Sequence, residues 1–237
     1  MELQEGIIVK TINYKESSKI IYIITSGGLD SIEVKGANKL NGHSHIYANL
    51  LSKIAYNSSK HFFKSGKVLN NYVNIKTNIS KLNSALQILE LAYSLIEHIT
   101  DFTIFYNFLD EILDLIDTKD NYEYYESIFF IKTLYLLGIA PSLNACVKCG
   151  KRENLLGFVF NMGGMICTDC YDQSYVLYES GTNTINNIRY LYYTKLDVLK
   201  ENEKEMNFSD IRRFYQRYYF EYLGYESKSY KILSKII

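Results

Sequence analysis

The sequence that decides the fold is the stretch CVKCGKRENLLGFVFNMGGMICTDC, which spans residues 146–170. It holds all four cysteines of the 237-residue chain, as two C-x-x-C pairs with seventeen residues between Cys149 and Cys167. This spacing is typical of a four-thiolate metal site, because each C-x-x-C turn aims two sulfurs at one point. The pattern therefore predicts a metal site with Cys146, Cys149, Cys167 and Cys170 as ligands.

The compartment decides whether these thiols bind a metal or form disulfides. The opening MELQEGIIVK lacks the basic and apolar regions of a signal peptide, and no apolar run approaches the ~18 residues of a membrane helix. We therefore expect a cytoplasmic protein with reduced thiols and no membrane association. Zn²⁺ is our interpretation of the metal, although softness and geometry alone do not separate it from a rubredoxin-like iron site.

The predicted metal site is structural. Four Cys ligands leave no open coordination position, and the chain has no H-x-E triplet of the kind a zinc deaminase uses. Gly150 and the pair Gly163-Gly164 favour tight turns beside the two knuckles, and LLGFVF at 155–160 is typical of a strand. These features predict a small zinc ribbon at about 141–175.

The first 78 residues are typical of a β-barrel. Three apolar or alternating runs, EGIIVKTINY, SKIIYIITS and GLDSIEVKGANK, are joined by turn residues that include Gly27-Gly28. Two further runs, YANLLSKIAY and KVLNNYVNIKT, would supply strands four and five. Five short strands in so few residues favour an OB-fold domain at 1–78 that binds nucleic acid.

The remainder, 79–237, is predicted to be an all-α domain into which the ribbon is inserted, which makes the whole chain an α+β protein. Apolar residues recur at helical spacing from Leu82 to Ile99 and from Phe105 to Ile116. A third helix, about 122–137, should end before Gly138 and Pro141, and two more are expected in TINNIRYLYYTKLDVLK and NFSDIRRFYQRYYFEYL.

Charge is distributed unevenly, although the chain has 26 basic and 26 acidic residues. Residues 1–78 carry ten Lys and five acidic residues, whereas residues 79–140 carry three Lys and ten acidic residues. The asymmetry indicates that different surfaces bind partners of opposite charge. The alternative is that the charge distribution drifted without a functional cause. On the second helix an acidic face is expected to be solvated; it consists of Asp110, Asp114 and Asp117.

Candidate DNA-binding residues lie in the basic first segment. Single-strand binding needs cations along the backbone and aromatic faces for the bases. Tyr14 meets the second requirement, and Tyr22 and Tyr72 are further candidates. The cations are Lys10, Lys15, Lys19, Lys35, Lys39 and Lys67.

The last helix carries a candidate partner site, Arg212, Arg213 and Arg217, followed by Lys228 and Lys231. Guanidinium groups could bind phosphate or an acidic tail, although cations near a helix C-terminus also occur without function. The chain lacks a phosphate-binding Gly loop, a G-x-S-x-G elbow and a convincing His and carboxylate pair. The sequence therefore gives no support to an enzyme.

Several strings resemble the RecO family of bacterial recombination mediators across essentially the whole chain. NYKESSKIIYIIT and GLDSIEVKGANK resemble its barrel, and YFEYLGYESKSYKIL resembles its C-terminal helix and basic tail. The most specific match is YYESIFFIKTLYLLGIAPSLNACVKCG followed by FVFNMGGMICTDC, which is similar to the family's helix and ribbon.

The resemblance implies a non-enzymatic DNA repair and recombination role at the bacterial nucleoid. It implies binding of single- and double-stranded DNA, annealing of complementary strands, and action with RecR to load RecA onto DNA coated by single-strand binding protein. The acidic C-terminal tail of that protein is an implied partner. Some members lack the cysteines, whereas this chain keeps Cys146, Cys149, Cys167 and Cys170, which the resemblance makes ligands of one structural Zn²⁺.

One departure from the family concerns the third strand. Where family members often have arginines, this chain has Gly36-Ala37-Asn38-Lys39, which contains a single cation. DNA contact there is expected to be weaker or to lie elsewhere. The alternative function is a zinc-ribbon interaction module in transcription or RNA handling, which should prefer RNA to DNA.

Overall fold

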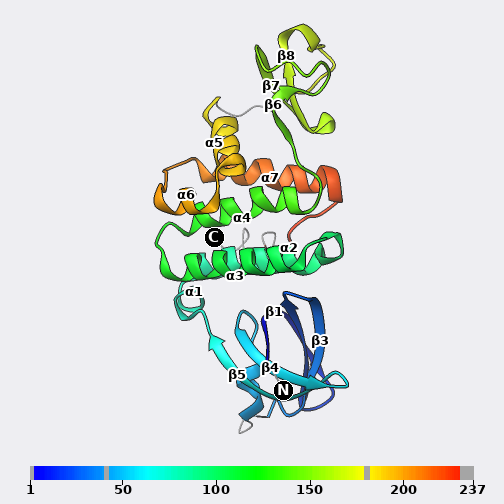
Figure 1. Cartoon of the computed structure of the whole chain (residues 1–237), viewed down its shortest axis with the longest axis vertical. Helices are drawn as coiled ribbons and strands as arrows, with labels where there is room; N and C mark the ends of the chain where they lie inside the picture. The colour runs from blue at the N-terminus through cyan, green and yellow to red at the C-terminus, as the bar shows by residue number, and fades with distance from the viewer. Residues whose placement is uncertain (1–2, 40–42, 179–181, 230–237) are drawn as a thin grey trace. The chain divides into compact units, whose positions relative to one another are not determined.

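The computed structural model describes residues 3–39, 43–178 and 182–229 (Figure 1). Contacts within the chain divide it into two units. The first is Met1–Tyr122 together with Lys228–Ile237, and the second is Glu123–Ser227. Lys231 of the predicted basic tail lies outside the described residues.

The first unit contains the predicted barrel. Its strands are β1 (Gln4–Tyr14), β2 (Ser18–Thr25), β3 (Gly28–Val34), β4 (Lys53–Ser59) and β5 (Phe62–Asn70). They close in the order β1-β2-β3-β5-β4, and β1 pairs with β4 to complete the barrel. A partly closed five-stranded barrel is the OB-fold architecture, so the predicted fold of this segment is confirmed.

Alternation of the strand residues places the barrel core. Ile8, Ile21, Ile23 and Ile54 are buried together inside, whereas Tyr22, which lies between Ile21 and Ile23 on β2, is only partly buried. A pleated strand turns alternate side chains to opposite faces, and the β-branched residues take the inner one. The interior is therefore filled, and any ligand of this barrel binds on its outer surface or at its ends.

The ends of the last two predicted strands were wrong. The run 47–56 becomes a strand only from Lys53, and η1 (His43–Tyr47), a 3-10 helix, precedes it. The run 67–77 leaves the sheet after Asn70, and its last five residues form α1 (Val73–Thr77). Asn70 Oδ1 accepts the backbone N–H of Tyr72 at 2.8 Å and turns the chain there. The prediction was wrong because apolar residues recur at alternate positions beyond this turn, which resembles the pattern of a strand.

Two long helices complete the first unit, α2 (Ile79–Ser94) and α3 (Phe102–Thr118), with the single 3-10 turn η2 (Ile96–His98) between them. Both start where the sequence supplies a cap. Asn78 accepts the backbone N–H groups of Ser80 and Lys81, and Asp101 accepts that of Ile104. Such side chains satisfy donors that the first turn of a helix leaves open. The predicted helices are confirmed.

The acidic face of α3 is only partly solvated, because Asp114 is exposed as expected whereas Asp110 and Asp117 are not. Asp110 accepts the ammonium of Lys53 on β4 at 2.6 Å, and Asp117 is buried and accepts the backbone N–H of Ile75 in α1 at 2.9 Å. Buried carboxylates require such partners. This face therefore joins α3 to the barrel and to α1 within the first unit, which its spacing in the sequence could not reveal.

The second unit contains α4 (Tyr122–Leu136), the ribbon and the last three helices. The ribbon strands are β6 (Ser142–Cys146), β7 (Leu155–Val159) and β8 (Gly164–Cys167), in the sheet order β6-β8-β7, with the short 3-10 turns η3 (Phe160–Met162) and η4 (Thr168–Cys170). The helices that follow are α5 (Thr182–Tyr193), α6 (Leu196–Glu201) and α7 (Phe208–Leu223). The ribbon prediction is confirmed, including the strand in LLGFVF.

One predicted helix is two. The run 184–200 breaks between α5 and α6, at the point where Lys132 of α4 reaches the end of α5. Its ammonium donates to the carbonyls of Tyr192 at 3.2 Å and Thr194 at 2.6 Å, which satisfies acceptors that a helix end leaves open. Burial lowers the pKa of Lys132. The single lysine in the apolar third helix is thus a cap for another helix.

Aromatic side chains form the core of the second unit. Phe158 and Phe160 of the ribbon pack against Phe214 of α7, with ring centroids 4.9 and 5.3 Å away. On α4, Phe130 stacks on Tyr215 of α7 at 4.3 Å. The ribbon and the last helix therefore share one core.

No helix in the described residues has the length and apolar character to span a membrane.

Candidate metal centre and nucleic-acid interface

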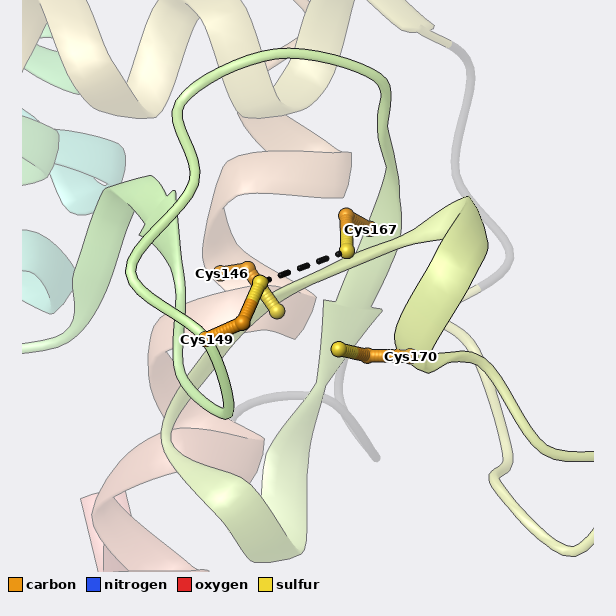
Figure 2. Close-up of side chains that lie close together, drawn as sticks. All are labelled: Cys146, Cys149, Cys167 and Cys170. Atoms are coloured by element: carbon orange, nitrogen blue, oxygen red, sulfur yellow. Dashed lines mark hydrogen bonds between the residues drawn. The ribbon is translucent and has the colours of Figure 1, made fainter.

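The four cysteines meet at one point in the ribbon (Figure 2). Cys146 ends β6, Cys149 follows in the next turn, Cys167 ends β8 and Cys170 lies in η4. All four Sγ atoms lie within 4.8 Å of one another, and the sulfurs of Cys149 and Cys167 are 3.6 Å apart. None is in a disulfide, whose S–S bond is about 2.05 Å. The predicted grouping of these residues is confirmed.

As the sequence predicted, both knuckles depend on glycines. The glycines are required for two different physical reasons. Gly150 has φ +75° and Gly163 has φ +68°, a region that disfavours other residues. Gly164 instead needs space, because a Cβ there would lie 2.5 Å from Val147 Cγ1 and 2.6 Å from the carbonyl oxygen of Ser142. Backbone approach between β6 and β8 therefore requires glycine, and it brings the two cysteine pairs together.

The thiols differ in acidity as a result of their surroundings. Desolvation raises the pKa of Cys146, but backbone N–H donors of Cys149, Cys167 and Lys148 outweigh it and lower the pKa to about 6. The neighbouring thiols Cys149 and Cys167 hydrogen-bond to Cys170 and raise its pKa to about 12. Four adjacent thiolates would repel one another, so full ionisation requires a cation among them.

The sulfur positions fit a metal ion. Tetrahedral Zn–S bonds of about 2.3 Å place sulfurs about 3.8 Å apart, close to the 3.6 Å between Cys149 and Cys167. Four thiolate donors match the soft-ligand preference of zinc and of iron–sulfur chemistry. Cys146, Cys149, Cys167 and Cys170 can thus hold one metal ion that ties β6, β8 and η4 together.

Four of the predicted DNA-binding residues gather near one end of the barrel. Tyr14 and Lys15 lie at the β1–β2 turn, with the Lys15 ammonium 4.7 Å from the Tyr14 ring centroid. The backbone N–H of Asn38 donates to Ser17 in that turn at 2.9 Å, which brings the segment with Lys35 and Lys39 beside it. These exposed residues join three cations and an aromatic face, the ingredients of single-strand binding.

Other predicted residues are engaged elsewhere in the first unit. The ammonium of Lys10 lies 4.1 Å from the ring centroid of Tyr93 on α2 and 5.5 Å from that of Tyr22. Tyr72 is fully buried, and its hydroxyl donates to Asp110 at 3.3 Å, so it offers no face to a base. Lys19 and Lys67 lie on β2 and β5; Lys67 is exposed and Lys19 partly so.

Sequence reasoning missed the hairpin between β4 and β5. Lys60 and His61 are exposed there and have positive φ of 51° and 62°. The backbone N–H of Glu33 on β3 donates to the carbonyl of His61 at 2.8 Å, and Lys35 lies 4.4 Å from the ring centroid of Phe62. The hairpin is thus at the same end of the barrel. The string SSKHFF between two strands was the only signal.

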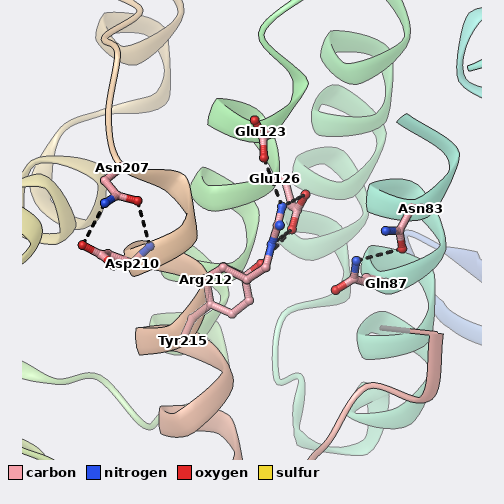
Figure 3. Close-up of polar contacts among 8 residues, drawn as sticks. All are labelled: Asn83, Gln87, Glu123, Glu126, Asn207, Asp210, Arg212 and Tyr215. Atoms are coloured by element: carbon pink, nitrogen blue, oxygen red, sulfur yellow. Dashed lines mark hydrogen bonds and ion pairs between the residues drawn. The ribbon is translucent and has the colours of Figure 1, made fainter. Parts of the chain in front are cut away.

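The arginines of α7 are not equivalent. Arg212 donates to Glu126 of α4 with Nε at 3.2 Å and Nη2 at 3.0 Å, and Glu126 is buried (Figure 3). Arg213 pairs with Asp210 and stays exposed, and exposed Arg217 lies 4.3 Å from the Phe160 ring centroid. The neighbouring rings, Phe214 and Tyr218, are buried in the core, so they offer no apolar surface beside the exposed arginines.

The class of protein is defined by an OB-type barrel, a set of helices and a four-cysteine ribbon that can hold a metal ion, and barrels of this type commonly bind nucleic acid. The family model described as "Recombination protein O C terminal" matches residues 76–231. "DNA repair protein RecO" of Listeria innocua is 26% identical and the match covers 98% of this chain and 94% of that protein. Proteins of the same name from Oceanobacillus iheyensis and an Exiguobacterium species are 26% and 25% identical, over 100% and 98% of this chain and 94% and 95% of theirs. The chain belongs to the RecO family.

Proposed function

We propose that this chain binds single- and double-stranded DNA in recombinational repair and anneals complementary strands. The carrying observation is the basic barrel end, defined here as Lys15, Lys35, Lys39 and Lys60 with Tyr14 beside them. Cations there can neutralise phosphates while the exposed ring stacks with a base. Membership of a family whose relatives are named DNA repair proteins supports this role.

The proposed role is binding rather than catalysis. With RecR, the protein would help to load RecA onto DNA coated by single-strand binding protein, whose acidic C-terminal tail would dock on the second unit. Exposed Arg213 and Arg217 are the residues we propose for the tail, because Arg212 is already committed to Glu126. Guanidinium groups are good partners for carboxylates.

The metal we propose is one Zn²⁺ with a structural function. Support comes from the donor set of four thiolates, which leaves no position for a substrate or a reactive water. When bound, the ion supplies charge neutralisation and a rigid cross-link. The four cysteines hold the ribbon strands in position, and the ribbon shares an aromatic core with α7.

Salt-dependent DNA binding tests the barrel assignment. The triple variant Lys15→Glu, Lys35→Glu, Lys39→Glu should lose most of its affinity for single strands in fluorescence anisotropy. The wild type, with ~4 phosphate contacts, should show a log-log salt slope of about −3, because each contact releases counterions. A triple reversal of the exposed Lys119, Lys195 and Lys204 is the matched control. Equal losses in both variants would show a non-specific charge effect and contradict the assignment.

The mediator role needs a separate assay. The purified protein should anneal complementary oligonucleotides coated with single-strand binding protein, and RecR with RecA should then form filaments on them. An RNA substrate of the same sequence serves as comparison, since an RNA-handling module would prefer it. Annealing of naked strands without any effect on coated strands would contradict the proposed mediator function while leaving DNA binding intact.

A further inference from the structure

A cavity of about 350 Å³ lies in the second unit, between the ribbon and α5. Its apolar lining includes buried Phe158 and Met165, together with Leu156 of β7 and Ile185 of α5. Its volume falls within the range of small-molecule sites. Among the described residues that line it, none is acidic and two are arginines. The cavity therefore combines apolar surface with concentrated positive charge.

One of these arginines, Arg189, is held in place. Its Nε donates to the carbonyl of Leu143 at 2.8 Å, and its Nη1 donates to Asn186 Oδ1 at 3.0 Å. Asn186 also lines the cavity. Within the described residues no acceptor takes Nη2, so one edge of the guanidinium remains for a ligand. A donor already fixed in position loses little conformational entropy on binding.

The other arginine, Arg152, carries a charge that the described residues leave without a partner. It is exposed and makes neither an ion pair nor a hydrogen bond among them. The adjacent Lys151, by contrast, pairs with Asp169 at 2.8 Å. No role in holding the fold together is visible for Arg152, and its place in the cavity lining sets it near Arg189.

We propose that this cavity binds a nucleotide unit, with its phosphate on Arg152 and Arg189 and its base against the apolar wall. Two guanidinium groups offer more donors than one carboxylate can use, whereas a phosphate presents three or more oxygens to them. Base and sugar would cover the side chains of Leu156 and Ile185. The inference rests on the proposed DNA-binding function and adds a contact outside the barrel.

Photo-crosslinking of the full-length, metal-loaded protein tests the site. A single-stranded oligonucleotide with 5-iodouracil should crosslink to peptides that line the cavity, mapped by mass spectrometry, in addition to barrel peptides. Arg152→Gln removes an exposed charge and Leu156→Glu adds a repelling one at a half-exposed position, so both should fold. Each should lower the crosslink yield at the cavity about tenfold. Lys195→Gln, an equal loss of charge at an exposed position outside the lining, should leave it unchanged.

The outcomes separate the inference from the proposed function. Unchanged cavity crosslinks in both variants, or crosslinks confined to the barrel, would overturn the cavity site and leave DNA binding intact. If the wild-type protein gave no crosslink at all, to the barrel or to the cavity, both the cavity site and the proposed DNA-binding function would be overturned. Competition by thymidine monophosphate would identify a free nucleotide as the ligand source, and resistance to it would identify a strand; either result supports the site. Protection of the cavity by an acidic peptide but not by the oligonucleotide would overturn the assignment of phosphate.

Discussion

At the scale of single residues, Arg212 shows that an ion-pair partner decides whether a charged side chain is available to a ligand. Its guanidinium, Glu126 and the Tyr215 hydroxyl, which donates to Glu126 at 2.7 Å, form a buried polar cluster between α4 and α7. Burial lowers the pKa of Arg212, but the carboxylate of Glu126 outweighs it and holds the pKa above its ordinary value. An arginine with this partner is fixed in the fold, whereas its neighbours on α7 are exposed.

The exposed pair on α7 carries the prediction for the acidic tail. Arg213→Glu and Arg217→Glu should each weaken binding of a labelled tail peptide more than tenfold, because charge-assisted contacts contribute about 1.5 to 3 kcal/mol each. Annealing of naked DNA should persist in both variants. Fluorescence anisotropy with the peptide measures the effect, and Lys195→Glu, at an exposed position before α6, is the control. Wild-type affinity in both variants would move the tail site off this helix.

At the scale of elements, side chains from distant parts of the sequence determine where short helices form. The five-residue α1 has no side-chain cap of its own at Tyr72. Asp117, forty-two residues further along, accepts the backbone N–H of Ile75 in its first turn at 2.9 Å. A helix this short is unstable alone, since nucleation costs more than a few hydrogen bonds return. Its existence therefore depends on α3.

Removal of this carboxylate should destabilise the first unit. Asp117→Ala leaves a buried N–H without an acceptor, so the free energy of unfolding should fall by about 1 to 3 kcal/mol. Urea denaturation followed by far-UV circular dichroism measures this change. Asp120→Ala, at an exposed site just beyond the end of α3, should change stability by less than about 0.5 kcal/mol. Similar stability of the two variants would refute the capping role.

At the scale of the whole molecule, the ion pairs found among the described residues join oppositely charged groups of the same unit. The acidic stretch 79–140 belongs mostly to the first unit, where Asp110 and Asp117 bind groups of β4 and α1. Within-chain contacts also group α1 to α3 with the barrel. The predicted boundary at residue 78 stays a prediction, which separate expression of the two segments would test.

The two units should respond differently to loss of the metal. Cys149→Ser should release the ion and raise hydrogen exchange in β6, β8 and the α7 residues that pack on the ribbon, because metal binding contributes directly to folding. Exchange in β1 to β5 should not change. Elemental analysis with hydrogen-exchange mass spectrometry measures both effects, and Thr168→Ser, an exposed position between two ligands, is the control. Stoichiometric metal retained in the Cys149 variant would exclude this four-ligand site.

Much of the fold could be read from local patterns. Period-two runs identified the strands, helical periods identified α2 and α3, Gly138 and Pro141 marked the end of α4, and cysteine spacing identified the metal ligands. These features repeat over a few residues, so the backbone geometry of a strand, helix or knuckle is enough to interpret them. Errors came where a pattern continued past a turn, as at Asn70, or where Lys132 reaches the end of a helix far away in sequence.

The sequence by itself determined the barrel, the helices and the cysteine cluster of this RecO-family protein. Only the tertiary structure decided which charges are available to a ligand. Lys10 lies against tyrosine rings, Arg212 is bound to Glu126 and Asp117 caps α1, whereas Lys60 and Arg152 remain exposed. The physical reason is that a residue type fixes a charge, but its availability depends on partners that folding brings from distant parts of the chain.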